Sequence, residues 1–306
     1  ASKSSPADNS TPAATTATTT DASGKNKINI NSAILSELDK FEAKLGVPAL
    51  SNKIQASRPY SKPEELVSKK VITQEQFDQI KDQVTIEDVV LTGEAKDIDY
   101  MVKLGLMKGH LLVAKELLDL KKPEAAEPHI GHPVEEIYAD VADQLQERKV
   151  PEFKKQLISL QDLVKSKPND PQLMTQFDAS MKAVDQAIAA LPETERQSPN
   201  FALKVVNGLL DTANSEYGAA IANGKITAPI EYQDSRGFVT YADTLNKSIA
   251  QQLTKQNAEA EKAIDSTMTQ LKTAWPAPIP PATPVLSTDK VTELIKSIEK
   301  DAQKVT

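Results

Sequence analysis

Apolar residues recur every three or four positions along most of the chain, which is the spacing of an amphipathic α-helix. Beyond residue 96 this spacing predicts long helices joined by short connections rich in Pro, Gly and Asn. We expect these helices over 97–118, 133–148, 152–166, 172–191, 198–223 and 229–274. Short connections favour antiparallel neighbours, so the pattern predicts an up-and-down helical bundle.

Shorter helical segments precede the bundle. The first covers 33–45, and Gly46-Val47-Pro48 turns the chain sharply into the next. The last covers 74–83, where Thr73 and Gln76 have the spacing of a capping box. Segments of this length, joined by tight turns, indicate a small helical domain ahead of the bundle.

Composition agrees with an all-α fold. Aromatic residues make up 4% of the chain and there are 10 glycines in 306 residues, which disfavours a β-sandwich or barrel. The absence of cysteine excludes disulfides, thiolate zinc sites and iron–sulfur clusters. No stretch approaches the roughly 20 apolar residues of a membrane span.

The two ends of the chain have different compositions from the middle. The Ser/Thr/Ala-rich start is too poor in large apolar residues to form a core, so we expect a disordered tether. Tethers of this kind are common after a cleaved signal or a lipidated terminus, which suggests an extracytoplasmic protein of the periplasm or thylakoid lumen, peripheral to a membrane. The expected organisation is a tether over 1–26, a small helical module over 27–84, a bundle over 85–274, a stiff proline-rich linker over 275–287 and a docked amphipathic helix over 288–306.

All 3 histidines of the chain, His110, His129 and His132, fall between Gly109 and Asp143. Glu135 and Glu136 follow His132 by about one helical turn, so a carboxylate could face the same side. Imidazole and carboxylate are the ligands that zinc, copper, iron or manganese takes where no thiolate is present. A net charge of -7 also suits cations and disfavours phosphate backbones. We therefore predict a divalent transition-metal site formed by His110, His129, His132, Glu136 and Glu135.

Each histidine also has an ordinary structural explanation. His110 lies on an apolar helix face and is expected to be buried, where it could bond a carbonyl. Pro128 should end a short helical turn and leave His129 in a loop. Pro133 suits a first helical position, which would make His132 an N-cap residue.

A second group of polar residues lies later in the chain. Glu231 and Asp234 share one helix face, and Arg236 could form a bidentate pair with a nearby carboxylate. A buried ion-pair network that braces the bundle is the preferred explanation for this group. With no cysteine, no Gly-x-Ser-x-Gly elbow and no phosphate-binding glycine loop, the sequence predicts a binding protein and not an enzyme.

The first module resembles a known family. KININSAILSEL followed by LGVPALSNKIQASRPYSKPEELVSKKVITQEQFDQIKD is similar to the helix-hairpin-helix module of the bacterial competence DNA receptor. It is equally similar to the photosystem II extrinsic protein, which uses the module without binding DNA. DNA-binding hairpins carry Gly-Ile-Gly, whereas Pro48 here removes one N–H donor from Gly46-Val47-Pro48. The resemblance therefore implies a module that docks a partner protein.

A weaker resemblance covers residues 97–250. GHLLVAKELL, AAEPHIGHPVEEIY and EYQDSRGF look like exported helical domains that occur with iron permeases and imelysin-like proteins. That likeness implies iron or another transition metal handled outside the cytoplasm. The imelysin motif Gly-x-His-x-x-Glu is not reproduced, because Gly109 directly precedes His110 and Glu116 is six residues further on.

Three functions follow from these observations. The leading expectation is an exported metal-binding protein whose hairpin module docks a partner. The alternatives are a structural accessory of a photosynthetic or transport complex without metal, and a DNA-uptake receptor.

Overall fold

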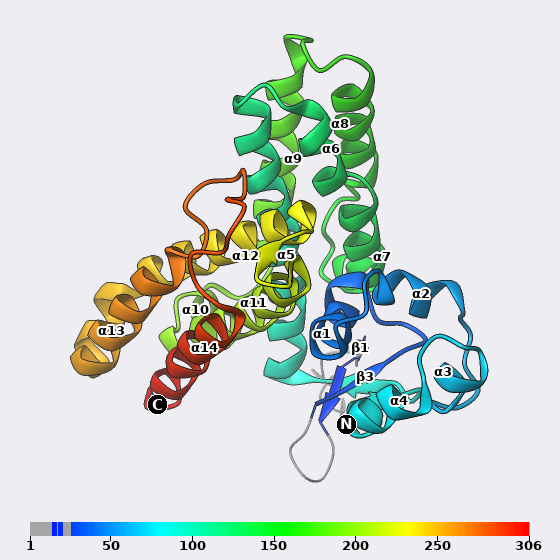
Figure 1. Ribbon diagram of the computed structural model, residues 1–306. Helices are drawn as coiled ribbons and strands as arrows, with labels where there is room; N and C mark the ends of the chain where they lie inside the picture. The colour runs from blue at the N-terminus through cyan, green and yellow to red at the C-terminus, as the bar shows by residue number, and fades with distance from the viewer. Residues whose placement is uncertain (1–13, 17, 21–25, 306) are drawn as a thin grey trace, which may run out of the picture.

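The computed structural model describes residues 14–16, 18–20 and 26–305. The fold is all-α, as predicted, with a few very short strands (Figure 1). Within this part of the chain, no helix is both long and apolar enough to cross a membrane.

Most of the tether predicted over 1–26 lies outside the described residues. The two short pieces that are described form strands β1 (Ala14–Thr16) and β2 (Thr18–Thr20). β1 pairs antiparallel with β5 (Val89–Leu91), and β2 pairs antiparallel with β3 (Asn26–Asn29). Threonine favours strands, and each piece meets an unpaired backbone edge.

The hairpin module contains the predicted series of short helices. They are α1 (Leu35–Leu45), α2 (Leu50–Ala56), α3 (Glu65–Ser68) and α4 (Gln74–Ile80), and β4 (Val84–Thr85) then pairs with β3. Both hydrogen bonds of the predicted capping box are present. Thr73 Oγ1 accepts from the Gln76 N–H at 3.1 Å, and Gln76 Oε1 accepts from the Thr73 N–H at 2.9 Å.

The bundle is built around one long helix, α5 (Gly93–Asp119), whose buried side chains contact most of its neighbours. The helices that follow are α6 (Pro123–Ile130), α7 (His132–Glu147), α8 (Lys154–Ser166), α9 (Gln172–Ala189) and α10 (Glu193–Arg196). The last group is α11 (Pro199–Ala220), α12 (Pro229–Ser248), α13 (Ala250–Lys272) and α14 (Thr288–Ala302). One apolar core joins residues from Tyr100 to Val305 with Ile34 of the module, and a second fills the rest of the module between Ile28 and Val84.

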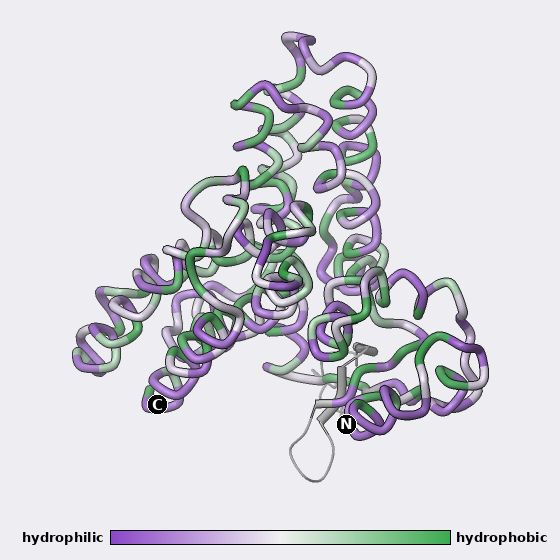
Figure 2. The backbone as a smooth tube through the Cα atoms, viewed as in Figure 1, coloured by the Kyte–Doolittle hydropathy of each residue, from purple (hydrophilic) through white to green (hydrophobic). Residues whose placement is uncertain are grey.

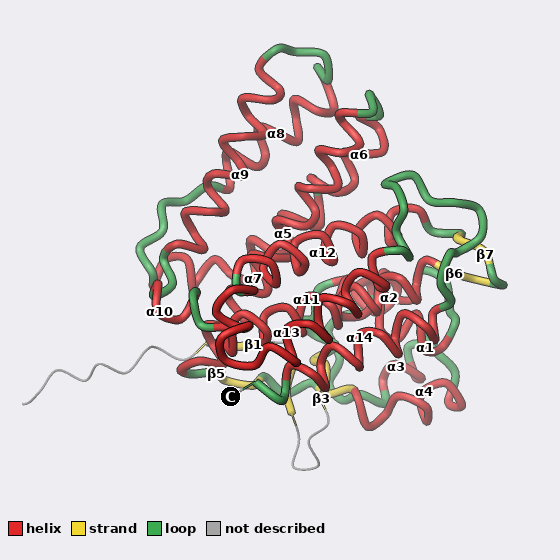
Figure 3. Tube along the Cα trace, turned by 90° about the vertical axis from the view of Figure 1, so that its left-hand side faces the viewer, coloured by secondary structure: helices red, strands yellow, loops and turns green. Residues whose placement is uncertain are grey.

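The arrangement differs from a single up-and-down bundle. α5, α8 and α9 run side by side, whereas α12, α13 and α14 run in another direction (Figures 1 and 3). The helix predicted over 229–274 is two helices that meet at Ile249. The Asn223-Gly224 turn, with both residues at positive φ, closes a short hairpin of β6 (Ile221–Ala222) and β7 (Lys225–Ile226), which the helical pattern did not predict.

The proline-rich segment after α13 lies against the bundle. Trp275 is buried and donates from its indole N–H to Ser235 Oγ at 2.7 Å. The carbonyl of Ala277 accepts from the Tyr232 hydroxyl at 3.1 Å. α14 follows, and its apolar positions alternate with hydrophilic ones along the helix (Figure 2). The helix is docked and amphipathic, as expected, and the residues of its apolar stripe are buried, namely Val291, Leu294, Ile295 and Ile298.

Glycines set how closely α5 and α12 approach. A Cβ at Gly237 of α12 would lie 2.1 Å from the carbonyl oxygen of Gly109 on α5, which no side chain tolerates. A Cβ at Gly109 would in turn lie 2.9 Å from the Gly237 carbonyl carbon. The close approach at Gly109 is therefore a backbone-to-backbone contact.

We expect Gly237→Ala to lower the free energy of unfolding by about 2 kcal/mol or more, because backbone has to move to admit the methyl group. Gly208→Ala on α11 is the matched control. Its Cβ would meet only a Val102 methyl group, at 2.7 Å, and alanine favours the helix by up to about 1 kcal/mol. Urea unfolding of both variants measures the difference, and equal stability of the two would contradict the backbone contact.

Candidate metal centre

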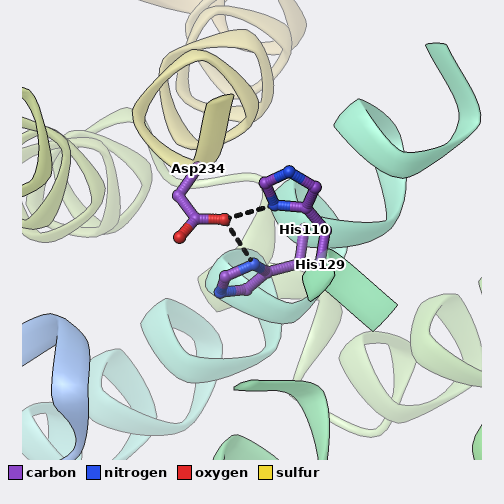
Figure 4. A group of neighbouring side chains, drawn as sticks. All are labelled: His110, His129 and Asp234. Atoms are coloured by element: carbon purple, nitrogen blue, oxygen red, sulfur yellow. Dashed lines mark hydrogen bonds and ion pairs between the residues drawn. The ribbon is translucent and has the colours of Figure 1, made fainter. Parts of the chain in front are cut away.

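The structure brings together His110, His129 and Asp234 (Figure 4). One ligand atom from each of these side chains lies within 4.8 Å of the other two. Asp234 Oδ1 lies 3.0 Å from His110 Nδ1 and 2.6 Å from His129 Nδ1. All three side chains are buried.

Three helices position these side chains. His110 directly follows Gly109 on α5, and Asp234 lies three residues before Gly237 on α12, so the glycine contact brings the imidazole to the carboxylate. His129 comes from α6. Its prediction as a loop residue was wrong, because α6 continues through Pro128 to Ile130. Burial of Ala126, His129 and Ile130 against the core outweighs the one backbone hydrogen bond that proline removes.

The ring of His129 is fixed from both sides. Its Nε2 lies 2.8 Å from Gln233 Oε1, and the amide of Gln233 is oriented by its own Nε2, which donates to the Pro278 carbonyl at 3.1 Å. Since Gln233 presents its oxygen, His129 Nε2 carries a proton and donates. The Nδ1 atom is therefore the one that faces Asp234 and is placed to bind a metal ion.

The charged forms of His129 and Asp234 stabilise each other. Burial opposes a charge on His129, but the attraction of Asp234 and the hydrogen bonds to Asp234 and Gln233 outweigh burial and raise the pKa of the imidazole. Burial likewise opposes the charge on Asp234, and the two histidines hold the pKa of its carboxyl well below the usual range. Without a metal ion, His129 and Asp234 form a buried ion pair.

His110 has no such arrangement. Its side chain is 1% exposed, and its Nε2 atom has no hydrogen-bond partner among the described residues. Nδ1 faces Asp234 Oδ1 at 3.0 Å (Figure 4), and the ring makes an edge-on contact with Phe238, with 5.1 Å between the ring centroids. A buried polar atom without a partner costs about 1–3 kcal/mol, so Nε2 lowers stability unless it gains one. Two imidazole nitrogens and one carboxylate oxygen are a common ligand set for a transition-metal ion.

The other predicted ligands lie outside this group. His132 is exposed at the first position of α7, with Glu135 in the same turn. Glu136 accepts from the Leu35 N–H at 3.2 Å and from Gln55 Nε2 at 2.7 Å, and so links α7 to the hairpin module. The prediction thus included two members of the group.

Asp234 was noted in the sequence but assigned to an ion-pair network. The residue of α12 that does form an ion pair is Arg236. It makes the predicted bidentate pair with Glu116, through Nε at 3.1 Å and Nη2 at 2.8 Å. Two residues of the same helical turn therefore have different partners. Arg236 links α12 to α5 through Glu116, and Asp234 points to the histidines. In the sequence, Asp234 has helical spacing from Phe238, which contacts His110. That spacing was the signal that could have placed Asp234 near the histidines.

A cavity of about 610 Å³ reaches the centre from the side of the hairpin module. It lies between α1, the start of α7, the end of α11 and the start of α12, and both His110 and Asp234 line it. Its acidic side chains are Asp39, Glu42, Glu136, Glu216, Glu231 and Asp234. No Lys or Arg is found among the described residues that line it, so we call it the acidic cavity.

Several acids of this cavity hold protons near neutral pH. Burial raises the pKa of Asp39 from 3.8 to about 7, against hydrogen bonds with Glu216 and Ser51 that lower it. Burial also raises the pKa of Glu231 to about 7. Burial and the charge of Asp39 raise the pKa of Glu216 well above its usual range. A cation that enters the cavity would replace these protons.

The turn between α1 and α2 faces the same cavity. Gly46, Val47 and Pro48 line it, and the Ser51 N–H at the start of α2 donates to Glu42 Oε1 at 3.3 Å. A backbone amide at this place would meet a phosphate in a DNA-binding hairpin. Here a carboxylate of the same chain occupies the position, which does not favour nucleic acid.

Two family models match parts of the chain. Residues 23–85 match the helix-hairpin-helix motif, and residues 192–306 match the iron permease-associated 4-helix bundle domain. The second match covers α10 to α14 and includes Asp234, whereas His110 and His129 lie outside both segments. No curated protein and no solved structure matches the chain.

The raised pKa of Asp39 has a consequence for stability. A carboxyl group whose pKa is higher in the folded state contributes stability below its unfolded pKa near 4 and loses it as pH rises through about 7. We expect Asp39→Asn, which keeps the shape and a donor toward Glu216, to be more stable than wild type by roughly 2–4 kcal/mol at pH 8 and by much less at pH 5. Urea unfolding in chelator at both values measures this, with the exposed Glu75→Gln as charge control. A difference that does not change with pH would contradict the assignment.

Proposed function

We propose that the protein binds a transition-metal ion at His110, His129 and Asp234. The observation that carries the proposal is the buried group itself, because His110, His129 and Asp234 place three ligand atoms within 4.8 Å of one another and His110 Nε2 has no hydrogen-bond partner within the described structure. A purely structural histidine at 1% exposure would normally have its nitrogens satisfied. A metal ion would satisfy Nδ1 and would balance the Asp234 carboxylate at the same time.

The ligand set limits the choice of metal. Two imidazoles favour Fe²⁺, Co²⁺, Cu²⁺ or Zn²⁺ over the purely oxygen-liking Mg²⁺ and Ca²⁺. The similarity of 192–306 to an iron permease-associated domain supports iron as the biological ion. Three protein ligands leave at least one position open toward the acidic cavity, which suits an ion that is delivered and released.

We further propose that the protein acts outside the cytoplasm as a binding or delivery protein and not as an enzyme. Support comes from the iron permease-associated match and from the Ser/Thr/Ala-rich first residues. The acidic cavity would raise the local concentration of cations beside the centre. A partner protein could use the α3–α4 side of the hairpin module, since α1 packs on α11 of the same chain.

The runner-up is a structural accessory without metal. The ion pair of His129 and Asp234 favours it, because that pair is complete without an ion. It leaves His110 unexplained. Nothing in the hairpin turn favours the DNA-receptor function, because Glu42 occupies the amide at the start of α2.

Calorimetric titration of metal-free protein with Fe²⁺, Co²⁺ and Zn²⁺ tests the proposal. We expect His110→Ala and His129→Ala each to weaken binding at least about 100-fold, because each removes a ligand. His132→Ala is the matched control, an exposed histidine from the same stretch, and should bind like wild type. Binding in wild type no tighter than about 100 μM would overturn the proposal. A loss in His132→Ala as large as in His110→Ala would move the site to the helix junction.

A further inference from the structure

Two acids meet where the hairpin module contacts the bundle. Asp39 lies on α1 and Glu216 on α11. The two helices approach closely, because a Cβ at Gly218 would lie 2.8 Å from the Cβ of Ala43. Asp39 lies one turn before Ala43, and both carboxyl groups line the acidic cavity, where each shifts the pKa of the other.

Both carboxyl groups are buried. Asp39 is 6% exposed and accepts a hydrogen bond from the Ser51 hydroxyl, whereas Glu216 is 2% exposed. Glu216 Oε2 is buried in the wall of the acidic cavity and has no hydrogen-bond partner in the described part of the chain. It is therefore an unsatisfied acceptor of the kind seen at His110.

Carboxylates in contact at low exposure repel each other strongly. Either one proton or one cation has to lie between them. No Lys or Arg is found among the described residues that line the cavity, and the His129 imidazole beside it is already paired with Asp234. Glu42 and Glu231 add further negative charge nearby.

We propose that Asp39 and Glu216 form a second cation site that takes a hydrated hard divalent cation of the Mn²⁺, Mg²⁺ or Ca²⁺ class. All the available donors are oxygens, namely two carboxylates and the Ser51 hydroxyl. Cations of this class bind through one or two carboxylates while keeping several waters. A cavity of about 610 Å³ has room for that hydration.

The second site shares no ligand with the His110, His129 and Asp234 centre and is tested separately from it, although the charge of Asp234 raises the pKa of both Asp39 and Glu216. Its donors come from both parts of the chain, so an ion bound there would fasten the hairpin module to the bundle. A cation that binds would displace the proton held between Asp39 and Glu216. Binding should therefore release protons and raise the thermal stability of the chain.

The test is a Mn²⁺ titration in which free Mn²⁺ is followed by electron paramagnetic resonance. Wild type should bind two Mn²⁺ per chain. Glu216→Gln, which keeps size and hydrogen bonding, should bind one, and the His110→Ala/His129→Ala double variant should also bind one. Asp211→Asn, an acid of the same helix α11 that is exposed and lines another cavity, is the control and should bind two.

A competition with Ca²⁺ tests the ligand class without any variant. Millimolar Ca²⁺ should displace one of the two Mn²⁺ ions, because Ca²⁺ takes oxygen ligands and not imidazole. The same addition to the double histidine variant should displace its single Mn²⁺. Asp39→Asn provides a second variant of the pair should Glu216→Gln fold poorly, and it too should bind one Mn²⁺.

The outcomes separate the two metal sites. If Glu216→Gln or Asp39→Asn binds as many Mn²⁺ ions as wild type, the pair holds only a proton and the inference is overturned. If the double histidine variant binds as many Mn²⁺ ions as wild type while Glu216→Gln binds fewer, the second site stands and Mn²⁺ does not occupy the histidine centre, whose function the Fe²⁺, Co²⁺ and Zn²⁺ titrations decide. One Mn²⁺ per wild-type chain, lost in the double histidine variant, also overturns the second site.

Discussion

The contact of Gly109 with Gly237 is the constraint on which the candidate centre depends. At this point the backbones of α5 and α12 touch, because neither position carries a side chain. His110 and Asp234 are adjacent to the contact on their own helices, so their separation is set by backbone geometry and not by flexible side chains. Sites on rigid elements hold their ligands more accurately than sites on loops. The Arg236–Glu116 pair fixes the same two helices on the opposite side.

Buried negative charge is the second common feature of the structure. Asp234 is paired with His129, whose pKa is raised, and the Asp39–Glu216 pair favours a bound proton, because the pKa of both acids is raised. Both places also hold buried polar atoms without a hydrogen-bond partner in the described structure, at His110 and at Glu216. Burying polar atoms in this condition lowers stability. Such a cost is typical of sites that are completed by a ligand, and here it occurs twice along the wall of one cavity.

The sequence predicted the helices better than their arrangement. Periodicity located nearly every long helix, and residue chemistry located the capping box at Thr73. The change of direction at Ile249 and the hairpin at Asn223-Gly224 were not predicted, because tertiary contacts decide how a continuous helical pattern is divided.

The candidate site shows the same limit. Clustering in the sequence pointed to His110 and His129, but it also added His132, which faces solvent because a new helix starts there. Asp234 is 105 residues from His129, and only the pairing of α5 with α12 brings it close. The glycines that create this pairing were visible in the sequence, yet they do not say which helix will occupy the space they leave.

The hairpin module acquires a physical role from these contacts. In its turn, Glu42 binds the amide that a phosphate would otherwise meet, and Pro48 removes another donor, so the turn presents carboxylate where a DNA-binding hairpin presents N–H groups. The turn of residues Gly46, Val47 and Pro48 forms one wall of the acidic cavity. The bundle alone would leave Glu216 and Glu231 facing solvent, where their carboxylates would be hydrated and their affinity for cations low. By covering them, α1 lowers the local polarity and adds Asp39, so that six acidic side chains line one cavity beside the histidines.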